Sequence, residues 1–201
     1  EEINNSPKNT LATVTPGDLK FADVNGDGKI TPDDRTKIGD PTPDVTYGIS
    51  LGLSYKNWEL SMEMMGQGGN QIYRTWDNYN WAQFNYMEQR LDRWHGEGTS
   101  NTQPLLNTKH AINSENSEYF IEDGRFFRIR NLQLAYSFDK TLLSKIRMQA
   151  LKVYVNIQNL KTWKHNTGYT PEIGGSAIAF GVDNGTYPVP AVYTFGINLT
   201  F

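Results

Sequence analysis

One segment near the start of the sequence has the residue types and spacing of a calcium-binding loop. Ca²⁺ takes about six to eight oxygen ligands, and EF-hand loops supply them from positions 1, 3, 5, 7, 9 and 12, with glycine at position 6. A plain Asn-Gly and Asp-Gly turn is the alternative, and an aspartate at position 12 reaches less far than the usual glutamate. We therefore expect Ca²⁺ as a structural clip. The six ligand positions are held by Asp23, Asn25, Asp27, the backbone carbonyl of Lys29, Thr31 and Asp34.

A second candidate site is the aromatic-rich segment that follows Met64. Its residues Trp76, Tyr79 and Trp81 could stack on sugar rings or dock a partner protein. The alternative is that these rings pack the segment into a small core of its own. Helical spacing, which predicts a short amphipathic helix, is shared by Phe84, Met87, Leu91 and Trp94.

The sequence contains no arrangement typical of an enzyme. It has no cysteine, and its three histidines are far apart and lack the spacing of a zinc site. No Gly-x-Ser-x-Gly nucleophile motif occurs, and the glycine-rich segment 66–69 lacks a Walker lysine. Glu59 and Glu63 share the polar face of a predicted strand, so we interpret them as polar residues of that face and not as a catalytic acid–base pair. We therefore expect no enzymatic activity.

Charge and hydropathy narrow the classes of protein further. The 201 residues include 19 Lys or Arg and 22 Asp or Glu, for a formal net charge of -3. Such a balance gives no basic surface for nucleic acid, which we exclude as a partner. No stretch approaches the roughly 18 apolar residues of a transmembrane helix. Transmembrane barrel strands alternate lipid-facing and lumen-facing residues, and they leave only a weak hydropathy signal.

Alternation of apolar and polar residues predicts a β-hairpin over residues 45–64 with a two-residue turn at Lys56-Asn57. Such a turn sets the register, and directly opposed residues point to the same face. On the other face, Ser54, Gly52 and Ser50 would oppose Glu59, Ser61 and Glu63. The first face would be wholly apolar. Its predicted pairs are Tyr55 with Trp58, Leu53 with Leu60, Leu51 with Met62, and Ile49 with Met64.

Three more alternating segments predict strands over residues 125–138, 151–158 and 193–201. The connections are of two kinds. The turn at 56–57 and the segment 139–149, which could hold one helical turn, are short, whereas 66–119 and 161–188 are long. Bacterial outer-membrane barrels have short periplasmic turns and long extracellular loops. We therefore expect both long connections to lie outside the cell.

A soluble β-sandwich would show the same alternation, and this alternative stays open on pattern alone. Three features favour the barrel. The loops are longer than the roughly 4–6 residues common in compact domains. Aromatic residues such as Tyr55 and Trp58 cluster at strand ends, as in an interfacial girdle. The polar face is rich in Ser, Gly, Asn and Gln and has few lysines, which suits a barrel lumen.

Several segments, in this order over nearly the whole chain, together resemble the C-terminal region of the SusC/RagA family of TonB-dependent outer-membrane transporters. Each segment alone is a weak match. They are residues 16–21, 23–28, 33–41, 46–48, 122–132, 153–160, 167–172 and 193–201.

The resemblance implies an all-β fold: about five C-terminal strands of a large transmembrane antiparallel β-barrel of about 22 strands, with long extracellular loops and a plugged lumen. Residues 1–43 would form an extracellular loop that holds the calcium loop, and residues 44–201 would belong to the barrel. Five strands cannot close a barrel, so we expect the chain to pair with strands and a plug outside it.

The resemblance also implies a function and a location. A transporter of this family would import a glycan or peptide nutrient across the outer membrane of a Gram-negative bacterium. It would work with a SusD-like surface lipoprotein and with TonB, the latter through an N-terminal part outside this chain. It further implies that Phe201, the aromatic residue that closes the last strand, acts as an assembly signal. The alternative function is a soluble, calcium-clipped β-sandwich that binds carbohydrate.

Overall fold

The computed structural model describes residues 2–76, 85–106 and 111–201. The chain divides into two compact units, which are described separately. The first unit comprises residues 1–40, 73–121 and 182–184, and the second comprises residues 41–72, 122–181 and 185–201. The structure thus groups much of the long aromatic segment with the N-terminal residues.

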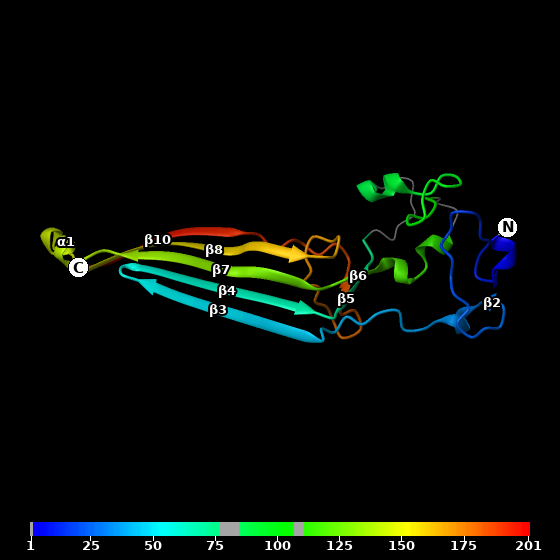
Figure 1. Ribbon diagram of the computed structural model, residues 1–201, viewed down its shortest axis with the longest axis horizontal. Coiled ribbons are helices and arrows are strands. Elements are labelled where there is room, and N and C mark those ends of the chain that lie inside the picture. The colour runs from blue at the N-terminus through cyan, green and yellow to red at the C-terminus, as the bar shows by residue number, and fades with distance from the viewer. Residues whose placement is uncertain (1, 77–84, 107–110) are drawn as a thin grey trace. The chain divides into compact units, whose positions relative to one another are not determined.

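The second unit is built on one antiparallel sheet of five long strands (Figure 1). Their order across the sheet is β10-β8-β7-β4-β3, so β3 and β10 are the two edges. Each predicted strand is present, and β8 extends six residues beyond its predicted end. The strand bounds are β3 Val45–Tyr55, β4 Trp58–Gly68, β7 Phe126–Ser137, β8 Ala150–Lys164 and β10 Val192–Thr200.

The hairpin register follows the prediction, because the two-residue turn and the alternation impose the same pairing. Lys56 adopts a left-handed φ of 53°, as a tight hairpin turn requires. All four predicted apolar pairs are observed, and the ladder continues to Val45 opposite Gly68. The next strand, β7, carries the pattern across the sheet, since Leu60 pairs with Leu134.

The apolar face of this sheet is open even on its central strands. Leu134 on β7 is 45% exposed and Val155 on β8 is 43% exposed, although both strands have a neighbour on each side. A sandwich would bury these side chains under a second sheet. No second sheet covers them in the described part of the chain, and this favours the barrel prediction over the soluble sandwich.

Aromatic side chains cluster at both ends of the apolar face. At the short-turn end, the rings of Trp58 and Tyr136 lie 4.7 Å apart. At the other end, Phe127 stacks on Trp163 at 5.6 Å and faces Tyr47 at 6.4 Å. The two clusters are about eight residues apart on β4, or roughly 27 Å along the strand, and a tilt of about 40° shortens this to about 20 Å across a membrane. These values bracket the roughly 25 Å apolar band of outer-membrane barrels.

Short helical turns follow β7, as the sequence predicted for residues 139–149. The α-helix α1 spans Lys140–Leu143 and the 3-10 helix η6 spans Ser144–Ile146. Leu143 is buried and anchors the turn. Among the described residues, no helix has both the length and the apolarity needed to cross a membrane.

The first unit contains mainly loops, short 3-10 helices and two-residue strands. Its described core includes Ile30, Ile112 and Phe120, all nearly inaccessible to solvent. Buried Asn113 links distant segments: its amide oxygen accepts from the Leu19 N–H at 2.8 Å, and its Nδ2 donates to Asp18 Oδ1 at 2.8 Å. Its elements are η1 Ile3–Asn5, β1 Lys8–Asn9, β2 Lys29–Ile30, η2 Pro32–Asp34, η3 Glu88–Asp92, η4 Ala111–Ser114, η5 Glu118–Phe120 and β9 Val182–Asp183.

Two further short strands, β5 Gln71–Arg74 and β6 Ile121–Asp123, lie where the chain passes from one unit to the other. In the first unit, β5 pairs in parallel with β9, with Tyr73 opposite Val182 and Arg74 opposite Asp183.

The amphipathic helix predicted around Met87 and Leu91 is wrong in type and in packing. The structure has only the five-residue 3-10 helix η3, and Leu91 on it is 71% exposed. Phe84 lies outside the described residues. Trp94 instead packs on Gly17, where an added Cβ would lie 2.3 Å from the indole ring. The apparent helical spacing therefore reflects a loop whose aromatic residues have different partners.

Candidate functional site

A bulge in the centre of the sheet gathers charged and amide side chains on its polar face. On β4, Glu63 pairs with Asn131 and Met64 pairs with Ile129, so Arg130 has no partner on that strand. The ladder with β8 shifts at the same place, and Asn159 has a left-handed φ of 52°. Bulges of this kind redirect side chains next to functional sites.

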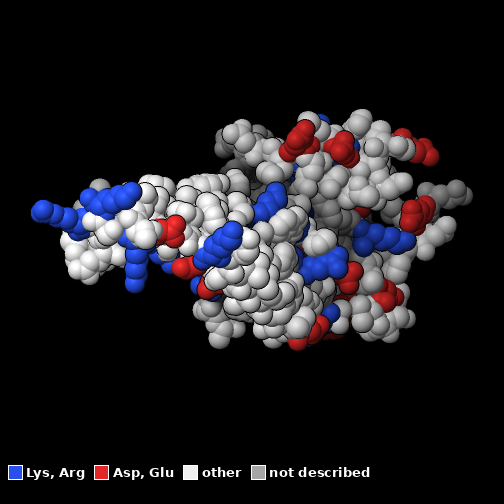
Figure 2. Space-filling model, turned by 60° about the vertical axis from the view of Figure 1, so that its left-hand side comes forward, with Lys and Arg blue, Asp and Glu red and all other residues white. Residues whose placement is uncertain are grey.

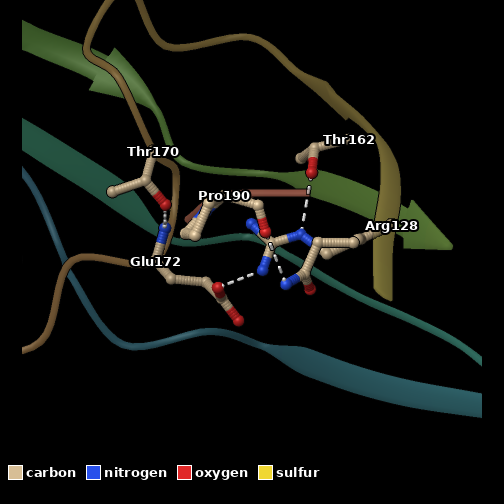
Figure 3. A network of polar contacts seen from close by, with 6 residues as sticks. Arg128, Thr162, Thr170, Glu172 and Pro190 are labelled. Carbon is tan, nitrogen blue, oxygen red and sulfur yellow. Dashed lines mark hydrogen bonds and ion pairs between the residues drawn. The ribbon is translucent and has the colours of Figure 1, made fainter. Parts of the chain in front are cut away.

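Arg128 lies at the centre of this site (Figure 3). Its side chain is only 5% exposed and forms an ion pair with Glu172 through Nη1. The Nε–H donates to Thr162 Oγ1 at 2.7 Å, and the guanidinium lies 5.5 Å from the Phe126 ring centroid. A buried guanidinium needs such partners, because burial of an unpaired charge is costly.

The segment between β8 and β10 supplies the carboxylate of this pair and is fixed at several points. The N–H of Glu172 donates to Thr170 Oγ1 at 3.3 Å, and Asn166 Nδ2 donates to the Thr170 carbonyl at 2.9 Å. At the far end of the segment, Asn159 Nδ2 donates to the Pro190 carbonyl at 3.1 Å. Figure 3 shows the carboxylate of Glu172 directed toward the guanidinium of Arg128. These contacts hold the segment against the polar face.

The same residues line a pocket of about 680 Å³. Within the described part of the chain, the buried Oδ1 atoms of Asn131 and Asn156 accept no hydrogen bond. Amide, guanidinium and carboxylate groups offer both donors and acceptors, so this pocket is suited to holding a polar chain. The lining consists of Glu63, Met65, Arg128, Arg130, Asn131, Asn156, Gln158, Asn159, Glu172 and Val189.

The residue pattern alone did not identify Arg128, Arg130 or Glu172 as site residues. A signal for the bulge was present, because the apolar positions 127 and 129 are odd-numbered, whereas Leu132 and Leu134 are even-numbered. An alternation that changes phase within one strand requires an extra residue. No comparable signal links Glu172 to the site, since it comes from an irregular segment.

The predicted calcium loop forms a tight turn in the first unit. Asp23 accepts N–H groups from Gly26 at 2.7 Å and Gly28 at 2.8 Å, and Gly28 has the left-handed φ of 80° that position 6 requires. Asp27 Oδ1 accepts from the Lys29 N–H at 2.8 Å. Ile30, which follows, is buried, and β2 pairs in parallel with β1 there.

Asp34, at position 12 of this loop, accepts backbone N–H groups through both carboxylate oxygens. Oδ1 accepts from Val24 at 2.9 Å, and Oδ2 accepts from Thr31 at 2.8 Å. The hydrogen bond from the Thr31 backbone is the main cause that lowers the pKa of Asp34 below its ordinary value. Across residues 2–76, 85–106 and 111–201, no three His, Cys, Asp or Glu side chains gather in an arrangement that could hold a metal ion. Calcium binding therefore stays a prediction.

The other predicted site residues are Trp76, Tyr79, Trp81 and Phe201. Trp76 is half-buried in the first unit, where its indole N–H donates to Asp183 at 3.2 Å and the Arg74 guanidinium lies 5.7 Å from its ring. Tyr79 and Trp81 lie outside the described residues. Phe201 directly follows β10 and is exposed. The roles predicted for these four residues stay predictions.

Proteins of known identity resemble this chain over most of its length. TonB-dependent receptor P26 of Formosa agariphila is 31% identical over 194 residues, which are 92% of this chain and 20% of that protein. TonB-dependent receptor P3 of the same organism is 30% identical over 199 residues, or 92% of this chain and 19% of the relative. TonB-dependent receptor SusC of Bacteroides thetaiotaomicron is 25% identical over 189 residues, which are 92% of this chain and 18% of SusC.

Solved structures share the fold. The RagAB peptide importer in its open-open state matches with a TM-score of 0.71 at 22% identity, over 92% of this chain and 20% of that chain. The RagAB peptide transporter also matches with a TM-score of 0.71, at 24% identity, over 87% and 19%. No protein-family model matches the sequence.

The chain spans about a fifth of the length of the curated relatives it matches. Those relatives are receptors, and the solved structures are transporters, which agrees with the expectation that the chain is not an enzyme. The order of its strands and the open apolar face agree with a piece of barrel wall. The chain is therefore homologous to part of the TonB-dependent receptors, SusC among them.

Proposed function

We propose that this chain forms the C-terminal part of the wall of a large outer-membrane β-barrel that imports a glycan or peptide nutrient. The observation that carries the proposal is the contrast between the two faces of the central strands. Leu134 lies with Leu60 and Val155 on an open apolar face. Its neighbour Gln133 pairs with Ser61 and Asn156 on the polar face. Lipid outside and water inside would satisfy both.

The two edges of the sheet support a larger barrel. Within the described residues, β3 and β10 each have a neighbour on one side only. The outer backbone groups of such edges need partners in a membrane, where water cannot bind them. Further strands of the same transporter would supply these partners and close the wall.

The polar face would line the lumen of this barrel. Its pocket around Arg128 and Arg130 would contact the plug or the passing nutrient through amide and charged groups. In this proposal, TonB drives import through the N-terminal part of the transporter, and a SusD-like lipoprotein covers the extracellular side. The relatives' designation as TonB-dependent receptors and the likeness to RagAB support these partners.

A matched pair of substitutions in the full-length protein tests the membrane assignment. Leu134→Arg places a cation on the lipid face and should cost about 2–4 kcal/mol near the midplane, whereas Gln133→Arg places it in the lumen. We expect Leu134→Arg to reduce strongly the heat-modifiable barrel in the outer-membrane fraction and Gln133→Arg to leave it near the wild-type level. Equal losses from both substitutions would refute the proposal.

We also propose that the Asp23–Asp34 loop binds Ca²⁺ as a structural clip on the extracellular side. The donor set fits this ion, because three carboxylates, an amide oxygen, a hydroxyl and the Lys29 carbonyl make six oxygens. Each carboxylate has about four lone-pair sites, so ligation is compatible with the N–H contacts seen at Asp23. The side chains of Asp27 and Asp34 would have to turn toward the ion.

Calorimetric titration of the full-length transporter with CaCl₂ tests this clip. Extracellular modules of this type bind Ca²⁺ with Kd values of about 10⁻⁴–10⁻³ M, and we expect wild-type binding in that range. Asp27→Ala should abolish the binding heat. Asp33→Ala is the matched control, because Asp33 stands at the non-ligating position 11 and is exposed. If Asp27→Ala binds Ca²⁺ as the wild type does, the loop is only a turn.

A further inference from the structure

We propose that the turn between β7 and β8 is a docking surface for the phosphate groups of phospholipids. This basic turn comprises residues 138–149, with Leu142 and the three cations Lys140, Lys145 and Arg147. The lipids would be those of the leaflet that faces the periplasm, since short barrel turns lie on that side. This inference rests on the proposed barrel function and adds a partner at a named surface.

The positive charge of the basic turn is not neutralised by neighbouring side chains. In the described part of the chain, Lys140, Lys145 and Arg147 are exposed and none of them forms an ion pair. Nearby Asp139 accepts a hydrogen bond from Asn57 at 2.8 Å, and Glu59 is already paired with Lys152 at 2.6 Å.

The local charge balance is therefore one-sided. Residues 55–59 and 137–152 carry five Lys or Arg and two Asp or Glu, a difference of three positive charges, although the whole chain has a net charge of -3. Figure 2 shows Lys and Arg side chains gathered at the end of the sheet that carries α1. An anionic surface is the complementary partner for such a cluster.

The turn holds these cations in a defined arrangement. Leu143 is only 1% exposed, and its carbonyl accepts from the Met148 N–H at 3.1 Å. Arg147 has a left-handed φ of 57° and closes η6, its N–H donating to the Ser144 carbonyl at 3.3 Å. The neighbouring Leu142 is 56% exposed. A fixed turn loses less conformational entropy on binding than a flexible tail.

The neighbourhood favours a lipid surface over a soluble protein partner. The cluster of Trp58 and Tyr136 lies at the same end of the apolar face, as rings at a membrane interface do. An exposed leucine among basic residues is the pattern of segments that lie in the headgroup region, with the apolar side chain inserted and the cations at phosphate depth. The basic turn thus continues the membrane-facing surface of the sheet.

Native mass spectrometry of the full-length transporter, titrated with phosphatidylglycerol or phosphatidylcholine, tests the inference. The variant is Lys140→Gln, Lys145→Gln and Arg147→Gln together. The matched control removes three exposed cations of the first unit with Lys8→Gln, Arg35→Gln and Lys37→Gln. Each basic residue near an anionic surface contributes about a fivefold gain in affinity. We therefore expect at least about a tenfold loss of phosphatidylglycerol affinity in the first variant, with no change in the control.

Three outcomes separate this inference from the proposed barrel. A wild-type protein without heat-modifiable barrel would refute the barrel itself. An assembled barrel that retains phosphatidylglycerol equally well in wild type and basic-turn variant would overturn only the lipid surface, as would an equal loss in the control. If the basic-turn variant fails to assemble, the wild-type protein is instead compared at low and high salt for its preference for phosphatidylglycerol over phosphatidylcholine. Loss of that preference at high salt supports the inference, and its persistence overturns the inference.

Discussion

The two compact units of this chain differ in how their central apolar side chains are covered. In the first unit, Phe120 and Ile112 are buried to within about one per cent, as in a water-soluble domain. In the second unit, Leu134 and Phe195 are 45% and 69% exposed although the backbone around them is regular. The difference agrees with the proposed barrel, in which water would surround the first unit and lipid would lie against the sheet.

The two units also differ in how their backbone N–H and C=O groups are hydrogen-bonded. The sheet pairs its N–H and C=O groups in long ladders that run from Val45 to Thr200. The first unit relies on side chains such as Asn113 and Asp34, which accept backbone N–H groups in loops. Loops of this kind depend on surrounding water for their remaining backbone groups, whereas a membrane-spanning wall must satisfy its own.

The largest effect is expected for a substitution in the buried core of the first unit. Phe120→Ala removes a ring that packs against Tyr119 at 5.0 Å and Tyr73 at 6.2 Å, and it should destabilise the first unit by about 3–5 kcal/mol. Hydrogen exchange of full-length protein should show faster exchange in residues 111–121, with the sheet unchanged. Leu91→Ala, at an exposed site of the same unit, is the control and should have almost no effect. Loss of the assembled barrel in Phe120→Ala would contradict the independence of the two environments.

A smaller effect is expected where the sheet itself contains a buried charge. Glu172→Gln leaves the guanidinium of Arg128 without its carboxylate and should cost about 1–3 kcal/mol, since Glu172 is partly exposed. The segment 165–191 should then exchange its amide hydrogens faster, while the ladders of β7 and β8 stay protected. Glu63→Gln is the control, because exposed Glu63 forms no ion pair among the described residues. Equal effects of the two substitutions would show that the Arg128–Glu172 pair does not hold the segment.

The smallest expected effect is a pH dependence of stability in the Asp23–Asp34 loop of the first unit that the sheet does not share. The pKa of Asp34 is lowered in the folded state, so its contribution to loop stability is present above the unfolded value of about 4 and is lost as pH falls through the folded value. Proteolysis or exchange in residues 23–34 should therefore increase below about pH 4. Asp34→Asn should remove this dependence. A sheet that loosened over the same pH range as the loop would count against the comparison.

Much of the fold could be predicted from the sequence because the relevant signal is local. The alternation from Val45 to Met64 and the two-residue turn fix both the pairing and the face of each side chain, and the observed register agrees at every predicted pair. The same rule predicted strands over residues 125–138, 151–158 and 193–201, which the structure has at 126–137, 150–164 and 192–200. When the two faces of a strand meet different solvents, the alternation of apolar and polar residues is sufficient to predict the strand and the face on which each side chain lies.

The prediction failed where spacing along the chain did not correspond to packing. Met87 and Leu91 have the separation of helix neighbours, yet Met87 is extended and directly precedes the short 3-10 helix η3 that holds Leu91, and both side chains are exposed. Trp94 instead found its partner at Gly17, which is 77 positions earlier in the sequence. Apolar periodicity in an irregular loop therefore carries little information, because tertiary contacts decide which residues are covered.

By itself, the sequence determined the strands, their two faces, the hairpin register and the donor set of the Asp23–Asp34 loop, all of which depend on residues close together in the chain. Only the tertiary structure decided that Arg128 pairs with Glu172, 44 residues away. Likewise, only the folded sheet brings the amide side chains of β7 and β8 together in one pocket at the bulge around Arg130. The reason is physical. Alternation is imposed by backbone geometry at each residue, whereas a long-range ion pair exists only after the sheet has brought distant segments together and buried the guanidinium.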